Sequence, residues 1–314
     1  MKEVAGIASA VAFIAITIFV GLYVTKSNIG SFEDKNLTKR GLDTPTIWIF
    51  IDSSEVNSRF WSDFGARSSR ALNIPLLNLC YESIVKNSIP KYHVEVLSGL
   101  QGVAEKLGGW DEIPGPMRNK RLPLKMEEMM FIKTAILAKF GGLWLPISTV
   151  CLTQIPTLPA DKVAFFGTDP TETYSGPDGT VIPNTSIMWA PKPETPIFVE
   201  WSESIFERID SGQSGKQTRN DANWDWVYVT STKKNDFLVF PHMELSRKDG
   251  GRRLELEDIF ASGTEGNLPF SVPHDAVFLP IKWSELNERR TFGWVLRLSE
   301  QQVMESDIAI KYLL

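Results

Sequence analysis

The sequence contains little cysteine and little histidine, with two cysteines and three histidines in 314 residues. Two cysteines are too few for a disulfide framework, and no Cys-x-x-Cys or His-Glu-x-x-His spacing indicates a zinc site. Basic residues are not in excess, because the formal net charge is -5 at pH 7. A general nucleic-acid binder needs a basic face, so we expect no nucleic-acid partner.

Charge is also missing from the N-terminus, where residues 4–24 include no charged side chain. A helix of this length spans roughly 31 Å, the thickness of a bilayer core. The run ends in Gly-Leu-Tyr-Val-Thr-Lys, which is a poor cleavage site for a signal peptide. We therefore predict an uncleaved single-pass membrane anchor over residues 1–25, followed by a polar linker over residues 26–43. Counting the flanking lysines and arginines places the rest of the chain on the cytoplasmic side.

Residues 44–314 have the pattern of an α/β domain. Residues 46–51, Thr-Ile-Trp-Ile-Phe-Ile, are typical of a strand buried on both faces. A helical stretch at 73–87 and an alternating strand at 92–97 follow, and this order indicates a parallel α/β unit. Further strands are predicted at 143–145, 163–166, 185–189, 237–240 and 276–279, and a helix at 195–209.

The strongest helix prediction covers residues 125–140. At about 100° per residue, one stripe of the helix has Lys133 in its middle and is otherwise apolar: Met126, Met129, Met130, Leu137 and Phe140. Gly141 and Gly142 supply the C-terminal stop. A lysine on an apolar stripe is costly to bury without a partner, so Lys133 is the strongest candidate for a functional cation. The alternative is a lysine whose stem lies along the edge of the core while its ammonium reaches water.

The segment from Lys139 to Thr153, Lys-Phe-Gly-Gly-Leu-Trp-Leu-Pro-Ile-Ser-Thr-Val-Cys-Leu-Thr, resembles the capsular polysaccharide synthesis proteins and their sugar-transferase relatives with a DXD motif. In that family a helix ends in an aromatic residue and two glycines, followed by a strand, an acidic turn and another strand. The strand at 46–51 and the segment 184–190 match further parts of the pattern, so the likeness covers about residues 44–210. The resemblance implies a GT-A-like glycosyltransferase fold, a Rossmann-like mixed sheet flanked by helices.

The sequence departs from this family at the acidic turn. The two acids of the motif are replaced by Pro146 and Ser148, and no Asp or Glu occurs between Glu128 and Asp161. The diphosphate of a sugar nucleotide is usually neutralised by a divalent cation held on carboxylate oxygens. We therefore predict no metal at this turn, and expect Mn²⁺ or Mg²⁺ only if remote carboxylates supply ligands. Lysine and arginine would then carry the charge compensation.

The residue patterns and the resemblance together give two groups of candidate site residues. The expected donor side consists of Asp52, Arg67, Arg70, Lys133, Trp144 and Ser148. The expected acceptor side consists of Asn184, Trp189, Asp225 and His242. Several have ordinary structural alternatives: Trp144 as a core aromatic, Asp52 and Ser148 as turn formers, and the two arginines as part of a solvated helix start. No catalytic base can be named from the sequence.

The sequence leaves two glycosyltransferase-like functions open, besides an unrelated membrane-tethered α/β scaffold. The first is a membrane-anchored transferase that moves a sugar from a nucleotide-sugar donor to a glycan or lipid-linked acceptor without an aspartate-bound metal. The second is a catalytically inactive glycosyltransferase-like protein that binds glycans or takes part in an assembly, which the missing acids favour. Anchored transferases of the secretory pathway usually face away from the cytoplasm, in contrast to the charge count, so the orientation stays open.

Overall fold

The structure is a computed structural model that describes residues 44–52, 75–119, 123–168, 183–213, 236–248, 251–264 and 267–314. The chain divides into two compact units, residues 1–44 and 45–314, and every helix and strand of the described residues belongs to the second unit. Among the described residues, no helix is both long and apolar enough to cross a membrane. The anchor predicted at residues 1–25 and the linker at 26–43 lie outside the described ranges.

A six-stranded mixed sheet forms the centre of this unit, in the order β2-β1-β3-β6-β5-β7. The strands β2, β1 and β3 are mutually parallel, β6 is antiparallel to both of its neighbours, and β5 is parallel to β7. The α/β class with a mixed sheet, predicted from the sequence, is therefore confirmed. The strand bounds are Thr46–Ile51 (β1), His93–Ser98 (β2), Gly142–Trp144 (β3), Val163–Phe166 (β5), Met188–Ala190 (β6) and Phe237–Phe240 (β7).

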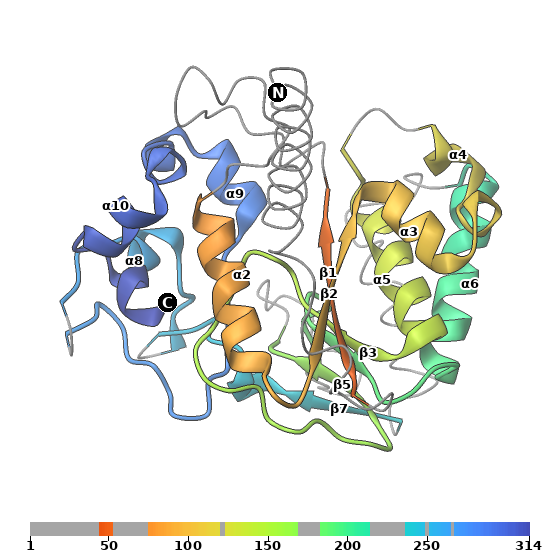
Figure 1. The fold of residues 1–314 in the computed structure, drawn as a ribbon, viewed down its shortest axis with the longest axis horizontal. Coiled ribbons are helices and arrows are strands. Elements are labelled where there is room, and N and C mark those ends of the chain that lie inside the picture. The colour runs from red at the N-terminus through yellow and green to blue at the C-terminus, as the bar shows by residue number, and fades with distance from the viewer. Residues whose placement is uncertain are drawn as a thin grey trace, which may run out of the picture. The chain divides into compact units, whose positions relative to one another are not determined.

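Helices cover both faces of this sheet (Figure 1). Alternate residues of a strand point to opposite faces, so Trp48 and Phe50 of β1 pack on one side while Ile47 and Ile49 pack on the other. The helices α3, α5 and α6 cover the first side, and α2 covers the second. Their bounds are Pro75–Ser88 (α2), Gly99–Leu107 (α3), Met126–Phe140 (α5) and Pro196–Asp210 (α6).

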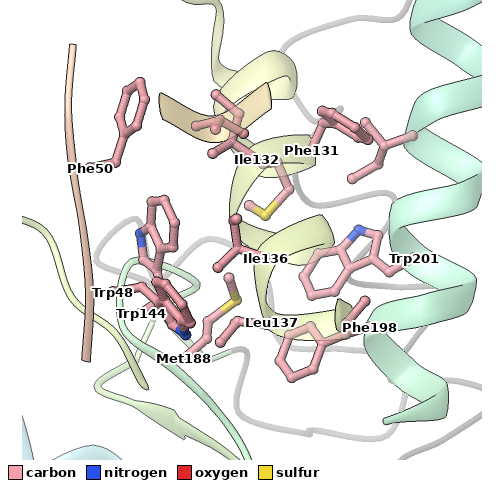
Figure 2. Close-up of a cluster of buried hydrophobic side chains, with 14 of the residues drawn as sticks. Trp48, Phe50, Phe131, Ile132, Ile136, Leu137, Trp144, Met188, Phe198 and Trp201 are labelled. Carbon is pink, nitrogen blue, oxygen red and sulfur yellow. The ribbon is translucent and has the colours of Figure 1, made fainter. Parts of the chain in front are cut away.

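The helix α5 is buried over a wider face than the predicted stripe. Phe131, Ile132 and Ile136 are buried although they lie off that stripe, whereas Met126 is 73% exposed. Figure 2 shows the reason, because α5 has the sheet on one side and α6, with Phe198 and Trp201, on the other. A helix packed on two sides needs apolar residues around most of its circumference, so a single stripe was the wrong expectation.

A second sheet has two strands, the first of which follows the double-glycine segment in the sequence. Its strands β4 (Thr149–Cys151) and β8 (Phe278–Pro280) are antiparallel, which joins the middle of the chain to its C-terminal part. The C-terminal part forms its own apolar cluster with α2 and β4. Its short helices were not predicted, since four to six residues show too little periodicity: Leu256–Ile259 (α8), Trp283–Glu288 (α9) and Glu300–Glu305 (α10), with α4 (Gly115–Arg118) equally short.

The two glycines after α5 bring β3 close to β1. Gly141 and Gly142 have φ of 67° and 95°, in the left-handed region that favours glycine. The carbonyl of Gly141 accepts a hydrogen bond of 2.7 Å from the Trp48 indole, and a Cβ on Gly142 would collide with the Thr46 carbonyl oxygen. The double glycine thus ends α5 and lets the chain pass directly along β1 to the bend at Pro146.

Candidate functional site

A cavity of about 440 Å³ borders the bend that follows β3. The bend comes directly after the carboxyl end of β3, and ligands of α/β proteins bind beside the carboxyl ends of parallel strands. The volume of the cavity is in the range of small-molecule sites. Polar and charged residues from four separate segments of the chain contribute to the lining: Ser148, Asn184, Ser186, Glu244, Ser246, Arg253, Lys282, Ser284 and Glu285.

The bend is a tight turn fixed against the C-terminal segment. The amide of Thr149 donates to the carbonyl of Pro146 at 3.1 Å. Ser148 is buried, its hydroxyl donates to the carbonyl of Ile281 at 2.9 Å, and its own carbonyl accepts from the Ile281 amide at 2.8 Å. The Ser148 hydroxyl proton is therefore already used inside the protein, which leaves the oxygen lone pairs for a ligand.

A buried carboxylate, Glu244, lies in the same cavity and is 6% exposed. The Asn184 amide nitrogen donates to its two carboxyl oxygens at 3.2 and 2.9 Å. The Asn184 carbonyl oxygen in turn accepts from the Ser186 amide at 2.9 Å, which fixes the orientation of the amide group. Gly167, with φ of 82°, passes so close to the carboxyl group that a Cβ there would overlap it.

Burial sets the acid strength of Glu244. Removal from water raises the pKa of its carboxyl to about 7, and the hydrogen bond from Asn184 offsets part of that rise. A group that titrates close to neutral pH can both accept and release a proton under ordinary conditions. Glu244 is therefore suited to proton transfer.

The cations of the cavity are Lys282 and Arg253. The Lys282 ammonium nitrogen is buried and has no hydrogen-bond partner among the described residues. Arg253 is more open, with its side chain 40% exposed, and its Nε lies 3.6 Å from a carboxyl oxygen of Glu255. Both residues belong to the C-terminal part of the chain, beyond the stretch that carries the family resemblance.

Lys133 approaches this region from α5. Its ammonium lies 3.4 Å from the carbonyl oxygen of Thr185, whose two neighbours in sequence, Asn184 and Ser186, line the cavity. Burial lowers the pKa of Lys133 to about 8. The side chain thus points into the protein beside the cavity wall, although Lys133 is not itself one of the lining residues.

Four of the predicted site residues lie elsewhere. Trp144 is 2% exposed and stacks on Phe50, so it is a core residue. Trp189 is also buried, and its indole donates to the carbonyl of Pro159 at 2.7 Å. Their aromatic surface is covered by the core, and neither residue lines the cavity.

The other two stand at the ends of strands. Asp52 follows β1 at the carboxyl edge of the sheet, where its carboxyl accepts a long hydrogen bond of 3.4 Å from the Leu124 amide. His242 lies exposed in the short turn Pro241–Met243 after β7, two residues before Glu244. Neither residue lines the cavity. Arg67, Arg70 and Asp225 lie outside the described residues.

The groups at the bend do not suit a divalent cation. Pro146 has no ligand atom, and within the described ranges no three His, Cys, Asp or Glu side chains gather into a metal-binding cluster. Two remote carboxylates, Glu244 and Glu285, do line the cavity, but Glu285 is paired with Arg289 at 3.0 Å. A lysine in the same lining would repel a dication.

Sequence reasoning missed Glu244, Arg253 and Lys282. The apolar run 237–240 was recognised as a strand, and the loop after a strand is a common place for functional residues. That argument selected His242 from its place after the strand, whereas the buried acid of this loop is Glu244. Lys282 and Arg253 carry no signal in the sequence, since lysine and arginine are common on any surface.

No family model matches the chain, and no curated protein matches it. Among solved structures, one similar chain is a glycosyltransferase involved in the glycosylation of the major capsid of PBCV-1, with a TM-score of 0.34 and 13% identity over 77% of this chain and 96% of that one. The PaToxG glycosyltransferase has a TM-score of 0.37 and 8% identity over 61% of this chain and 70% of that one.

The apo-form glycosyltransferase GlyE of Streptococcus pneumoniae TIGR4 is also similar, with a TM-score of 0.33 and 10% identity over 65% of this chain. The match spans 46% of the length of GlyE. Similarities with such low TM-scores and identities support no conclusion about the fold or activity of this chain.

Proposed function

We propose that the chain is a membrane-anchored, GT-A-like glycosyltransferase that uses a nucleotide-sugar donor without a metal bound at the bend. The observation that carries the proposal is the cavity itself, which borders Pro146 and Ser148 at the carboxyl end of β3 and contains both a cation and a carboxylate. In the family that residues 44–210 resemble, this bend lies beside the donor diphosphate. The acceptor would be a glycan or a lipid-linked sugar, presented at the membrane by the N-terminal anchor.

The residues of the cavity can be assigned to the parts of such a reaction. The acceptor hydroxyl oxygen forms a bond to the anomeric carbon, and the bond from that carbon to the diphosphate oxygen breaks with its electron pair leaving on the diphosphate. Glu244 can accept the proton of the hydroxyl, because its pKa of about 7 leaves much of it ionised at neutral pH. Protein cations at the cavity would stabilise the negative charge that develops on the leaving group.

A turnover experiment tests this proposal. The full-length chain in detergent is incubated with a panel of UDP- and GDP-sugars in EDTA, and release of the nucleoside diphosphate is followed with and without added glycan acceptors. We expect slow release from at least one donor, and slower release in Glu244→Gln. A wild-type chain that consumes no donor would refute the transferase.

The inactive alternative is favoured by the chemistry of the bend, where proline and an internally hydrogen-bonded serine replace two acids. On this alternative the cavity binds a sugar or nucleotide but performs no transfer. Saturable binding of a donor or a free glycan, with no nucleoside diphosphate released over a day, would support it.

Replacement of Lys133 by methionine should weaken donor binding and stabilise the fold. Burial lowers the pKa of Lys133 because it disfavours the charged ammonium. Removing this charge should raise the free energy of unfolding at pH 7 by about 1–2 kcal/mol. Loss of a cation near the diphosphate should reduce donor affinity roughly tenfold. Denaturant unfolding and calorimetric titration measure the two effects.

Lys139 supplies the control for Lys133. It lies on the same helix, but its ammonium bonds to the carbonyl of Leu107, away from the bend. Lys139→Met should leave donor affinity unchanged. If Lys133→Met lowers stability and leaves affinity intact, Lys133 is a packing residue and has no part in the site.

A further inference from the structure

We propose that Lys282 binds the diphosphate of the ligand, and so takes the place that a divalent cation would have beside the Pro146–Ser148 bend. The inference rests on the proposed function for its choice of ligand, but the anion site is argued from the cavity alone. It identifies the ligand class as an organic diphosphate ester, a group that is shared by nucleotide sugars and by lipid-linked diphosphates.

The first observation is an ammonium group left without a partner. Lys282 lines the cavity, and its nitrogen is buried with no hydrogen-bond partner in the part of the chain that the structure describes. Withdrawing an ammonium from water without a compensating partner costs several kcal/mol, so such a group is either deprotonated or provided with an anion. A phosphate group would supply the acceptor that this ammonium lacks, because its oxygens accept hydrogen bonds.

The second observation is the connection between Lys282 and the bend. The backbone next to Lys282 is tied to Ser148 by two hydrogen bonds, from the Ser148 hydroxyl to the Ile281 carbonyl and from the Ile281 amide to the Ser148 carbonyl. Lys282 is therefore held beside the position where the motif of the family places its acids. The nitrogen is covered in this structure, and rotation of its flexible four-carbon stem would bring it to the ligand.

The third observation is that two more buried polar groups next to Lys282, in the sequence or across the small sheet, have no hydrogen-bond partner among the described residues. Thr149, which pairs with Pro280 across β4 and β8, has a buried hydroxyl with no hydrogen-bond partner. Trp283, next in sequence to Lys282, has a buried indole N–H that is also without one. Among these three groups Lys282 is the one that lines the cavity. An anion in the cavity would supply the acceptor that the Lys282 ammonium lacks among the described residues.

The other charged groups that line the cavity limit where the anion can lie. Glu244 and Glu285 would repel it when ionised, whereas Arg253 would attract it. Glu285 is paired with Arg289, which also pairs with Glu257. The diphosphate is therefore expected beside Lys282 and Arg253, with the sugar and its hydroxyl groups toward Asn184 and Glu244.

Titration with inorganic pyrophosphate tests the anion site. Calorimetry on the full-length chain in detergent, in EDTA, compares the wild type with Lys282→Gln, Lys282→Arg and the control Lys162→Gln, a change at an exposed lysine outside the cavity. We expect Lys282→Gln to lose roughly tenfold or more in affinity, and Lys282→Arg to stay within about threefold of the wild type. UDP and geranyl diphosphate, titrated in parallel, distinguish a nucleotide source from a lipid source of the diphosphate.

Two results would overturn the inference. One is a Lys282→Gln variant that binds pyrophosphate as the wild type does. The other is a wild type that binds no pyrophosphate at all. If Lys282→Gln then also unfolds at a lower temperature than the wild type, Lys282 is a structural residue. If Lys282 controls pyrophosphate binding but no nucleotide sugar is consumed, the anion site stands and the transferase fails. If Lys282→Gln binds and consumes nucleotide sugars normally, the transferase stands and this inference fails.

Discussion

Replacing Gly142 by alanine should destabilise the protein by about 3 kcal/mol or more, the largest single-residue effect we expect. The residue has φ of 95°, which an alanine adopts only with strain. The added methyl group would also overlap the Thr46 carbonyl oxygen and lie 2.9 Å from the Trp48 indole nitrogen. Because this oxygen belongs to the main chain of the neighbouring strand β1, it cannot move aside as the end of a flexible side chain would. Urea unfolding followed by tryptophan fluorescence measures the effect.

Gly102→Ala is the matched control for this change. Gly102 lies inside α3, and its added Cβ would meet only the Leu97 backbone at an ordinary 3.6 Å. Alanine is the better helix former, so this variant should gain about 0.5–1 kcal/mol. A Gly142→Ala variant as stable as the wild type would mean that β3 does not run against β1 as described, and the position of the bend would be wrong.

Glu244 should make stability fall as pH rises from about 4.5 to about 7. Its pKa is about 7 in the folded chain, against an ordinary value of 4.5. Between these values the folded protein holds a proton that the unfolded chain has released, so the stabilising contribution is complete below pH 4.5 and is lost as pH rises through 7. The difference corresponds to about 3 kcal/mol. Unfolding free energies from pH 4 to 9 measure it.

Glu244→Gln should remove this part of the pH dependence. Glutamine has the same shape as the protonated acid and can still accept a hydrogen bond from Asn184, so its stability should match that of the wild type at low pH and exceed it at pH 8. Glu82→Gln, at an exposed position of α2, should leave the wild-type slope in place. Parallel pH profiles for wild type and Glu244→Gln would contradict a carboxyl group held close to neutral pKa.

The regular part of the fold could be predicted from the sequence because its signals are local. The buried strand at 46–51 is a continuous apolar run, and α5 ends at two glycines, so both were predicted within one or two residues of their bounds. The pairing of β4 with β8 could not be predicted, since it joins residues 149–151 to residues 278–280 and three-residue strands show no periodicity.

The candidate site was only partly accessible from the sequence for the same reason. Ser148 and Asn184 line the cavity, and both lie in segments marked by the family resemblance. Glu244 and Lys282 come from the part of the chain with no such pattern, and their significance depends on burial and on missing partners. Trp144 and Trp189 were selected as aromatic residues near the bend and near segment 184–190, but neighbouring residues of a strand face opposite sides. Proximity in sequence therefore did not place them at the cavity.

Metal-independent binding of a nucleotide sugar is the most direct test of the central claim. Calorimetric titration of the full-length wild-type chain with UDP- and GDP-sugars is carried out once in EDTA and once in Mn²⁺. We predict that at least one donor binds, with dissociation constants that agree within about twofold between the two conditions, because protein cations neutralise the diphosphate. Binding that requires Mn²⁺, or no binding of any donor, would contradict charge compensation by the protein alone.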